Sequence, residues 1–569
     1  MKQMNYFKML LACALVLALA SCENISPVEK PIEQGGQGGR TVKLGLQLEP
    51  GTKVTLSDED KFAWEEGDKI AVLVGANASS GHFIECAVNA SNEITVSLND
   101  GEDVIYAVYP SHLSETIPFP AYSEDKLSIN LPSSYNFSEV SYTDDTQKKS
   151  KTPLPMVGVK TVSSSENTLV FYNVGGMLRL TVKRIPTDAT GLDIQFPGKK
   201  VNGTFVVSKP GTNEPSISTG ATTENDKIRI TFDAGIDTAT VNIPLPTGEY
   251  GEVFVTPVGG STKVAAIRHI KAGGYTAVRA KGKLLTATMV SFTVNSSNKK
   301  VIIAPGNLQA TYNSGADEDK KWTWHFAASQ WEFMGNTTGS SNLKINGNGT
   351  VSNNGTVDLF AWVGASNTTW SGDLGTTGNA AMHGITNATT MGNETDYGNT
   401  IAESLKSDWG KTINDGNAWR TLNKDEWTHL LSSRSGGTAN GTSKARLTYA
   451  TITDLNVNGF ILFPDGVTIG SDEVTSWGKI NGDSGSTKTQ CTSAQWTDLE
   501  AKGCVFLPAA GHRRYFSSKW ELTSDNYYWS SSYRGDNNQQ AVAKGFDNLT
   551  GEAGIKRQRG CAVRLVHDL

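Results

Sequence analysis

Residues 41–48 read Thr41-Val42-Lys43-Leu44-Gly45-Leu46-Gln47-Leu48, with an apolar side chain at every second position. Successive side chains of a strand point to opposite faces, so this stretch predicts a strand with one apolar face. From there to about residue 287 the chain continues as short apolar runs separated by Gly, Pro, Asn and Asp. This pattern is typical of a mostly β protein and predicts two β-sandwiches, over residues 41–160 and 161–287.

The segment before this strand has the features of an export signal. Lys2 and Lys8 precede an apolar run, residues 9–18, that is too short to span a bilayer. The following Leu19-Ala20-Ser21-Cys22 resembles the lipobox of bacterial lipoproteins. That resemblance implies a signal peptide over residues 1–21 and an acylated Cys22 that anchors the protein in the outer membrane at the cell surface. An ordinary signal peptide with a chance cysteine is the alternative.

Residues 22–40 contain two prolines and a Gly-rich run, and they lack apolar periodicity. This composition predicts a flexible tether. After removal of the signal peptide, 49 Lys and Arg remain against 57 Asp and Glu, a net charge of −8. The acidic balance argues against nucleic acid as a partner.

Four short motifs follow one another in the first half of the chain: Trp64–Val72, Tyr106–Pro110, Leu154–Gly158 and Phe171–Leu180. In this order they resemble the fimbrillin-type (type V) pilins and their surface-lipoprotein relatives. The resemblance implies tandem transthyretin-like β-sandwiches and pilin partners joined by strand donation. In that family, cleavage after a basic residue frees the subunit and opens an acceptor groove. Arg40 stands where such a cut would fall, or it is merely the last tether residue.

Twelve of the thirteen tryptophans lie beyond residue 321, which places a domain boundary near residue 288. Ordered stretches in this region resemble a C-terminal major-paralogue domain that is related to the C-type-lectin-like fold. They are Val301–Gln309, Val357–Trp362, Trp419–Trp427, Val505–Gly511, Tyr528–Ser532 and Ala562–Val566. The resemblance implies an α+β lectin-like domain over residues 288–569. The residue pattern allows helices at residues 405–409, 423–431 and 493–502 only.

The stretch Trp419–Trp427 also resembles a helix of the formylglycine-generating enzymes, which share the lectin-like fold. The cysteines of this chain do not fall in that family's motif, so we interpret the stretch as scaffold and expect no enzyme activity. The eight histidines show no metal-ligand spacing. The calcium motifs of true lectins are not intact, and we expect neither a metal nor another cofactor.

An aromatic and polar cluster near the end of the chain is the candidate recognition surface. Flat aromatic rings bind sugars or proteins at low entropic cost, and polar side chains supply hydrogen bonds. We expect ligand binding through Trp520, Tyr533, Arg534, Asp536 and Asn537. The neighbouring Trp529 is instead expected to fill the core.

Two modifications are also predicted. Cys504 and Cys561 each begin a strand-like run, so either a disulfide or two buried thiols fits the sequence, and export favours the disulfide. Cys86 and Cys491 are expected to be unpaired. The tripeptide at Thr238 resembles a short O-glycosylation motif.

Taken together, these features predict a surface adhesin. One form is a tip-type pilus subunit that accepts a strand and donates none, because its last strand belongs to the lectin-like domain. Residues 23–40, however, contain no obvious strand for cleavage to remove. The alternative is a non-polymerising outer-membrane lipoprotein that captures a glycan or a host protein.

Overall fold

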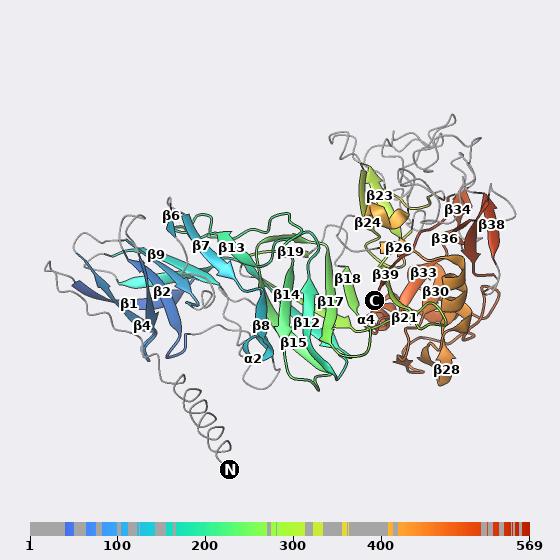
Figure 1. Cartoon of the computed structure of the whole chain (residues 1–569), viewed down its shortest axis with the longest axis horizontal. Helices are drawn as coiled ribbons and strands as arrows, with labels where there is room; N and C mark the ends of the chain where they lie inside the picture. The colour runs from blue at the N-terminus through green and yellow to red at the C-terminus, as the bar shows by residue number, and fades with distance from the viewer. Residues whose placement is uncertain are drawn as a thin grey trace, which may run out of the picture.

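The computed structural model describes residues 40–49, 64–74, 82–99, 104–111, 122–123, 126–142, 155–162, 167–269, 275–279, 281–312, 322–333, 356–360, 362, 408–413, 419–513, 520–521, 527–533, 540–547, 549, 552–556 and 560–569. Within these residues the protein is mostly β, as the sequence predicts. Figure 1 shows an elongated molecule with β1 near one end, β12 and β17 in the middle, and the described part of the C-terminal region (residues 288–569) at the other end.

The first sheet has seven strands in the order β3-β2-β5-β9-β10-β1-β4. They are β1 (Arg40–Leu48), β2 (Lys69–Val74), β3 (His82–Ala87), β4 (Glu93–Leu98), β5 (Val104–Tyr109), β9 (Met156–Thr161) and β10 (Thr168–Asn173). The two edge strands approach each other, since the Cys86 thiol donates to the Thr95 carbonyl oxygen at 3.6 Å. The sheet thus curves around its own core.

Strand β1 lies inside this sheet, antiparallel to β4 and parallel to β10. Its alternating pattern has the predicted effect: Val42, Leu44 and Leu46 are buried, whereas Lys43 and Gln47 are exposed. The sequence therefore predicts both this strand and its buried face correctly.

A three-stranded sheet, β13-β7-β6, packs on the outer face of the first sheet. It combines β6 (Tyr122–Ser123) and β7 (Lys126–Leu131) with β13 (Gly203–Val206). The next strand, β8 (Ser134–Asn136), runs parallel to β14 (Lys227–Thr231). The chain thus enters the second sandwich at β8 and then returns to the first sheet at β9, so the strands of the two sandwiches do not divide at one position near residue 160.

The second sandwich consists of two sheets, β15-β11-β20 and β18-β17-β12-β14-β8. Its further strands are β11 (Gly176–Lys183), β12 (Ala189–Gln195), β15 (Thr238–Leu245), β17 (Glu252–Gly259), β18 (Ala266–His269) and β20 (Gly282–Thr288). The short pair β16 (Gly248–Tyr250) and β19 (Tyr275–Ala277) lies beside them. Apolar residues of both sheets form one cluster, so the sheets face each other across a common core.

The C-terminal region is built from small sheets around one large core. The first sheet of this region has the order β21-β22-β39-β26, with β21 (Phe292–Thr293), β22 (Lys300–Ile303), β39 (Leu565–Asp568) and β26 (Trp419–Thr421). Two three-stranded sheets follow: β24 (Trp322–Phe326), β23 (Leu308–Tyr312) and β25 (Thr356–Val357) form one, and β28 (Thr442–Ala445), β27 (Gly437–Ala439) and β31 (Thr468–Ile469) form the other. A four-stranded sheet has the order β32 (Thr489–Cys491), β29 (Leu447–Ile452), β30 (Val457–Leu462) and β33 (Val505–Pro508). The last two sheets are the pair β34 (His512–Arg513) and β35 (Trp520–Glu521), and the three strands β36 (Tyr527–Tyr533), β37 (Gln540–Gly545) and β38 (Ala553–Lys556). The lectin-like assignment of this region stays a prediction.

The helices of this region are short. A 3₁₀ turn, η4 (Trp409–Thr412), precedes α3 (Lys424–Thr428), which continues as a π-helical turn, η5 (His429–Ser433). Helix α4 (Ser493–Ala501) is capped by the Thr492 side chain. Trp496 and Leu499 of α4 are both buried, as their spacing predicts. Among the described residues, no helix is long and apolar enough to cross a membrane.

Candidate functional site

Arg40, the predicted processing residue, is the exposed first residue of β1. Residues 40–45 pair with β4, and residues 45–48 pair with β10. A cut after Arg40 would therefore remove one paired residue and leave the rest of β1 in the sheet. At this position, cleavage alone opens no acceptor groove between β4 and β10.

The end of β1 is tied to the second sandwich by an ion pair. Nη1 of Arg279 lies 2.8 Å from each carboxylate oxygen of Glu49. The same carboxylate accepts a hydrogen bond from the backbone N–H of Asn173 at 3.1 Å. Glu49 is buried, so the positive charge of Arg279 and the Asn173 N–H compensate its negative charge. These contacts connect the end of β1 to β10 of the first sheet and to the second sandwich.

The strand β39 is equally enclosed, because it lies between β22 and β26. Arg420 of β26 donates through Nε and Nη2 to Asp568 of β39, and through Nη1 and Nη2 to Glu426 of α3 at 2.7 and 2.8 Å. Burial alone would lower the pKa of Arg420, yet the two carboxylates raise it overall. β39 is thus held in its sheet by side-chain as well as backbone contacts.

The stretch Trp419–Trp427 places Trp419, Leu422 and Trp427 in the core of the C-terminal region. Glu426 and Asn423 form a capping box at the start of α3. The indole N–H of Trp427 donates to the Trp529 carbonyl oxygen at 3.2 Å, and that of Trp529 donates to the Phe360 carbonyl oxygen at 2.7 Å. Trp529 is fully buried, which confirms its predicted place in the core.

The predicted recognition residues are only partly described. Trp520 belongs to β35, opposite Arg513 of β34, and Tyr533 ends β36, opposite Ala541 of β37. Their side chains, and the whole of Arg534, Asp536 and Asn537, lie outside the described residues. Figure 1 shows β34, β36 and β38 at the same end of the C-terminal region. Only the backbone positions of Trp520 in β35 and Tyr533 in β36 therefore place the predicted recognition surface.

The structure does not contain the predicted disulfide between Cys504 and Cys561, and both side chains are buried thiols. Cys504 directly precedes β33, whose partner strand is β30, whereas the backbone of Cys561 pairs with Phe360. The prediction assumed neighbouring strands, and these segments have different partners. Burial raises the pKa of Cys504, and it raises the pKa of Cys86 to about 11 and of Cys491 to about 12. Thiols of this kind are poor nucleophiles.

Thr238, the predicted glycosylation residue, begins β15 and is exposed. Its hydroxyl donates to the Asp237 carboxylate at 3.2 Å. The residue is accessible for modification, and glycosylation there stays a prediction. Among the described residues, no group of three or more His, Cys, Asp or Glu is arranged to hold a metal ion.

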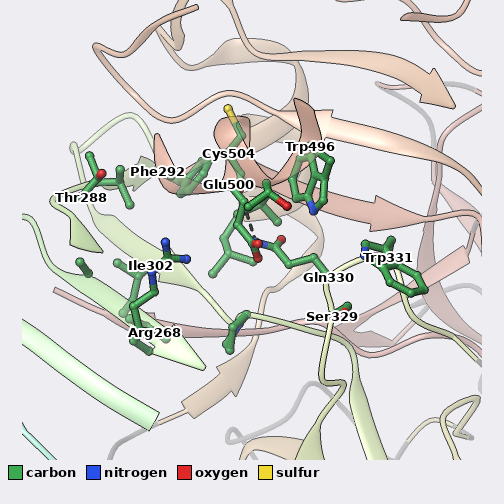
Figure 2. Close-up of a pocket in the computed structure, with 18 of the residues that line it drawn as sticks. Arg268, Thr288, Phe292, Ile302, Ser329, Gln330, Trp331, Trp496, Glu500 and Cys504 are labelled. Carbon is green, nitrogen blue, oxygen red and sulfur yellow. Dashed lines mark hydrogen bonds between the residues drawn. The ribbon is translucent and has the colours of Figure 1, made fainter. Parts of the chain in front are cut away.

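A cavity of about 200 Å³, which no sequence pattern indicates, lies where the second sandwich meets the C-terminal region (Figure 2). Around it, the Thr288 hydroxyl donates to the Ala501 carbonyl oxygen, and Arg184 donates to the Gly466 carbonyl oxygen at 3.3 Å. The rings of Phe254 and His567 lie 5.0 Å apart at the same junction. Contacts of several kinds therefore join the two units.

Among the polar side chains that line this cavity, three come from distant parts of the sequence: Arg268 of β18, Glu500 of α4 and Gln330. Gln330 is fixed, because its Nε2 donates to Glu500 at 3.0 Å and its Oε1 accepts from the Phe506 N–H at 2.9 Å. Figure 2 shows Arg268 and Glu500 extending into the same space from different sides. No local motif links these residues, so a sequence pattern could not have found them.

No protein-family model matches the chain, and no curated protein matches it. Among solved structures, it is similar to candidate cell adhesion proteins from Bacteroides uniformis (16% identity, 43% of this chain and 92% of that one, TM-score 0.24) and Bacteroides ovatus (13%, 44% and 96%, TM-score 0.28). It is also similar to the fimbrial anchor protein Mfa2 from Porphyromonas gingivalis (11%, 38% and 78%, TM-score 0.21). At these TM-scores the similarities carry no argument about function.

Proposed function

We propose that this protein is a cell-surface adhesin, held at the outer membrane through Cys22, that presents its C-terminal region to a glycan or a host protein. The lipobox and the ordered fimbrillin-type motifs support the location. The mostly β fold is compatible with a cell-surface adhesin. The buried, weakly nucleophilic thiols favour binding over the formylglycine-generating alternative, since that chemistry needs a reactive cysteine pair.

The single observation that carries the choice between the two adhesin forms is the interior position of β1. Strand exchange needs a sheet with a vacant place or a strand free to leave. Both β1 and β39 are paired on two sides within this chain. These pairings favour the non-polymerising surface lipoprotein.

The tip-type subunit remains the second candidate, because Arg40 is exposed and accessible to a protease. This form requires that β1 itself leaves the sheet, either by cleavage beyond Leu48 or by displacement. It would then accept a donor strand between β4 and β10.

Binding by the predicted recognition residues tests the adhesin proposal. The full mature chain is applied to glycan and host-protein arrays, beside the variants Trp520→Ala and Arg534→Ala. Lys209→Ala, an exposed change just after β13 and far from the C-terminal region in sequence, is the matched control. We expect a ligand that the wild type and the control bind and that both variants bind at least tenfold more weakly, as for interface residues of these types. Equal binding by all four proteins would contradict the assigned surface.

A further inference from the structure

The cavity at the junction brings two opposite charges together without pairing them. Arg268 donates through Nε to the Thr286 carbonyl oxygen, and within the described part of the chain its two terminal nitrogens have no hydrogen-bond partner. Glu500 accepts from Gln330 through Oε1, and no described residue donates to its other oxygen. Neither side chain forms an ion pair with another described residue.

Charges in such a place need a counter-charge. Burial lowers the pKa of Arg268, and the negative charge of Glu500 partly opposes this effect. The two groups are therefore near enough to influence each other and too far apart for a direct ion pair. A partly buried charge without a partner is costly, so a bound molecule that meets both groups would be stabilised there.

The remaining walls define what kind of molecule fits. Ile302, Val290 and Phe292 supply apolar surface, and Trp331 and Trp496 supply aromatic surface. Since an engineered cavity of about 150 Å³ holds a benzene molecule, about 200 Å³ gives room for a molecule the size of an amino acid. Charged and polar groups beside aromatic and aliphatic walls, in a cavity at a domain junction, are typical of small-molecule sites.

We propose that this cavity binds a small zwitterion, an α-amino acid with an apolar side chain, whose carboxylate pairs with Arg268 and whose ammonium pairs with Glu500. Both contacts are charge-assisted hydrogen bonds, the strong class in a partly buried site. The apolar side chain lies against the tryptophan and aliphatic walls. The site goes beyond the adhesin function, because β18 and α4, which carry the two charges, lie apart from β34, β36 and β38 (Figure 1).

Isothermal titration calorimetry of the full mature chain tests this assignment with three probes. L-Leucine carries both charges, 4-methylpentanoate lacks the ammonium, and 3-methylbutylamine lacks the carboxylate. We expect L-leucine to bind at least tenfold more tightly than either analogue, since each lost charge-assisted contact is worth about one factor of ten. No heat of binding with millimolar L-leucine, or equal affinity for the three probes, would overturn the proposal.

Two variants assign the charges to their residues. Glu500→Gln keeps an acceptor for Gln330 and removes the negative charge, so it should weaken L-leucine about tenfold and leave 4-methylpentanoate unchanged. Arg268→Gln should weaken L-leucine similarly and leave 3-methylbutylamine unchanged. Arg229→Gln, which breaks an exposed pair with Asp193, is the control and should change nothing. Unaltered L-leucine affinity in both cavity variants would refute the site. If a variant fails to fold, the comparison of the three probes on the wild type still decides.

Discussion

Shortening Leu44 to alanine tests whether β1 is an integral part of the first sheet. Leu44 is fully buried and lies opposite Ile94 of β4. Removing a buried leucine side chain to the β-carbon costs about 2 to 5 kcal/mol, from lost burial and the cavity that remains. With about 3 kcal/mol, the opening equilibrium of the sheet rises on the order of a hundredfold.

Hydrogen exchange measured by mass spectrometry on the full chain reports this opening segment by segment. In Leu44→Ala, the amides of β1, β4 and β10 should exchange on the order of a hundredfold faster, whereas those of β36 and β37 in the C-terminal region should not change. Lys43→Ala alters the exposed face of the same strand and serves as the control. If both variants exchange like the wild type throughout the first sheet, β1 does not pack as described and the reasoning fails.

Three further predictions concern the buried thiols, Lys544 and Glu426. Denatured, unreduced protein should yield alkylated peptides of both Cys504 and Cys561, and a crosslinked peptide would contradict the thiol state. Burial lowers the pKa of Lys544 from 10.5 to about 8, so between these values the unfolded chain binds more protons and stability should rise with pH. In urea titrations, the free energy of unfolding of Lys544→Met should not rise over this pH range. An equal rise in the wild type and the variant would contradict the lowered pKa of Lys544. Glu426→Gln keeps the helix cap and removes a carboxylate from Arg420, so unfolding should become easier by about 1 to 3 kcal/mol, and an unchanged urea midpoint would show that the pair adds nothing.

Local patterns predicted local structure well. The alternation in residues 41–48 predicts β1 and its buried face, since successive side chains of a strand point to opposite faces and only one face of β1 is buried. The spacing of Trp496 and Leu499 likewise predicts the buried side of α4. The sequence also predicts that Trp529 lies in the core, and Trp529 is fully buried there.

Long-range pairing could not be predicted in the same way. Nothing in the residues of β8 shows that it joins β14 rather than the first sheet, because a strand of three residues carries little register information. The disulfide prediction failed for the same reason: two strand-like runs were assumed to be neighbours. Arg268 and Glu500 lie 232 positions apart in the sequence, and only the packing of the two units brings them to one cavity.

The residue at which the chain begins on the cell surface shows whether β1 stays in its sheet there. Protein released from intact cells is digested, and its N-terminal peptide and any attached lipid are identified by mass spectrometry. We expect chains that retain β1, beginning at acylated Cys22 or, if a protease acts at Arg40, at Thr41. Chains that begin beyond Leu48, in material that assembles into polymers, would contradict this expectation and establish the strand-accepting pilus subunit instead.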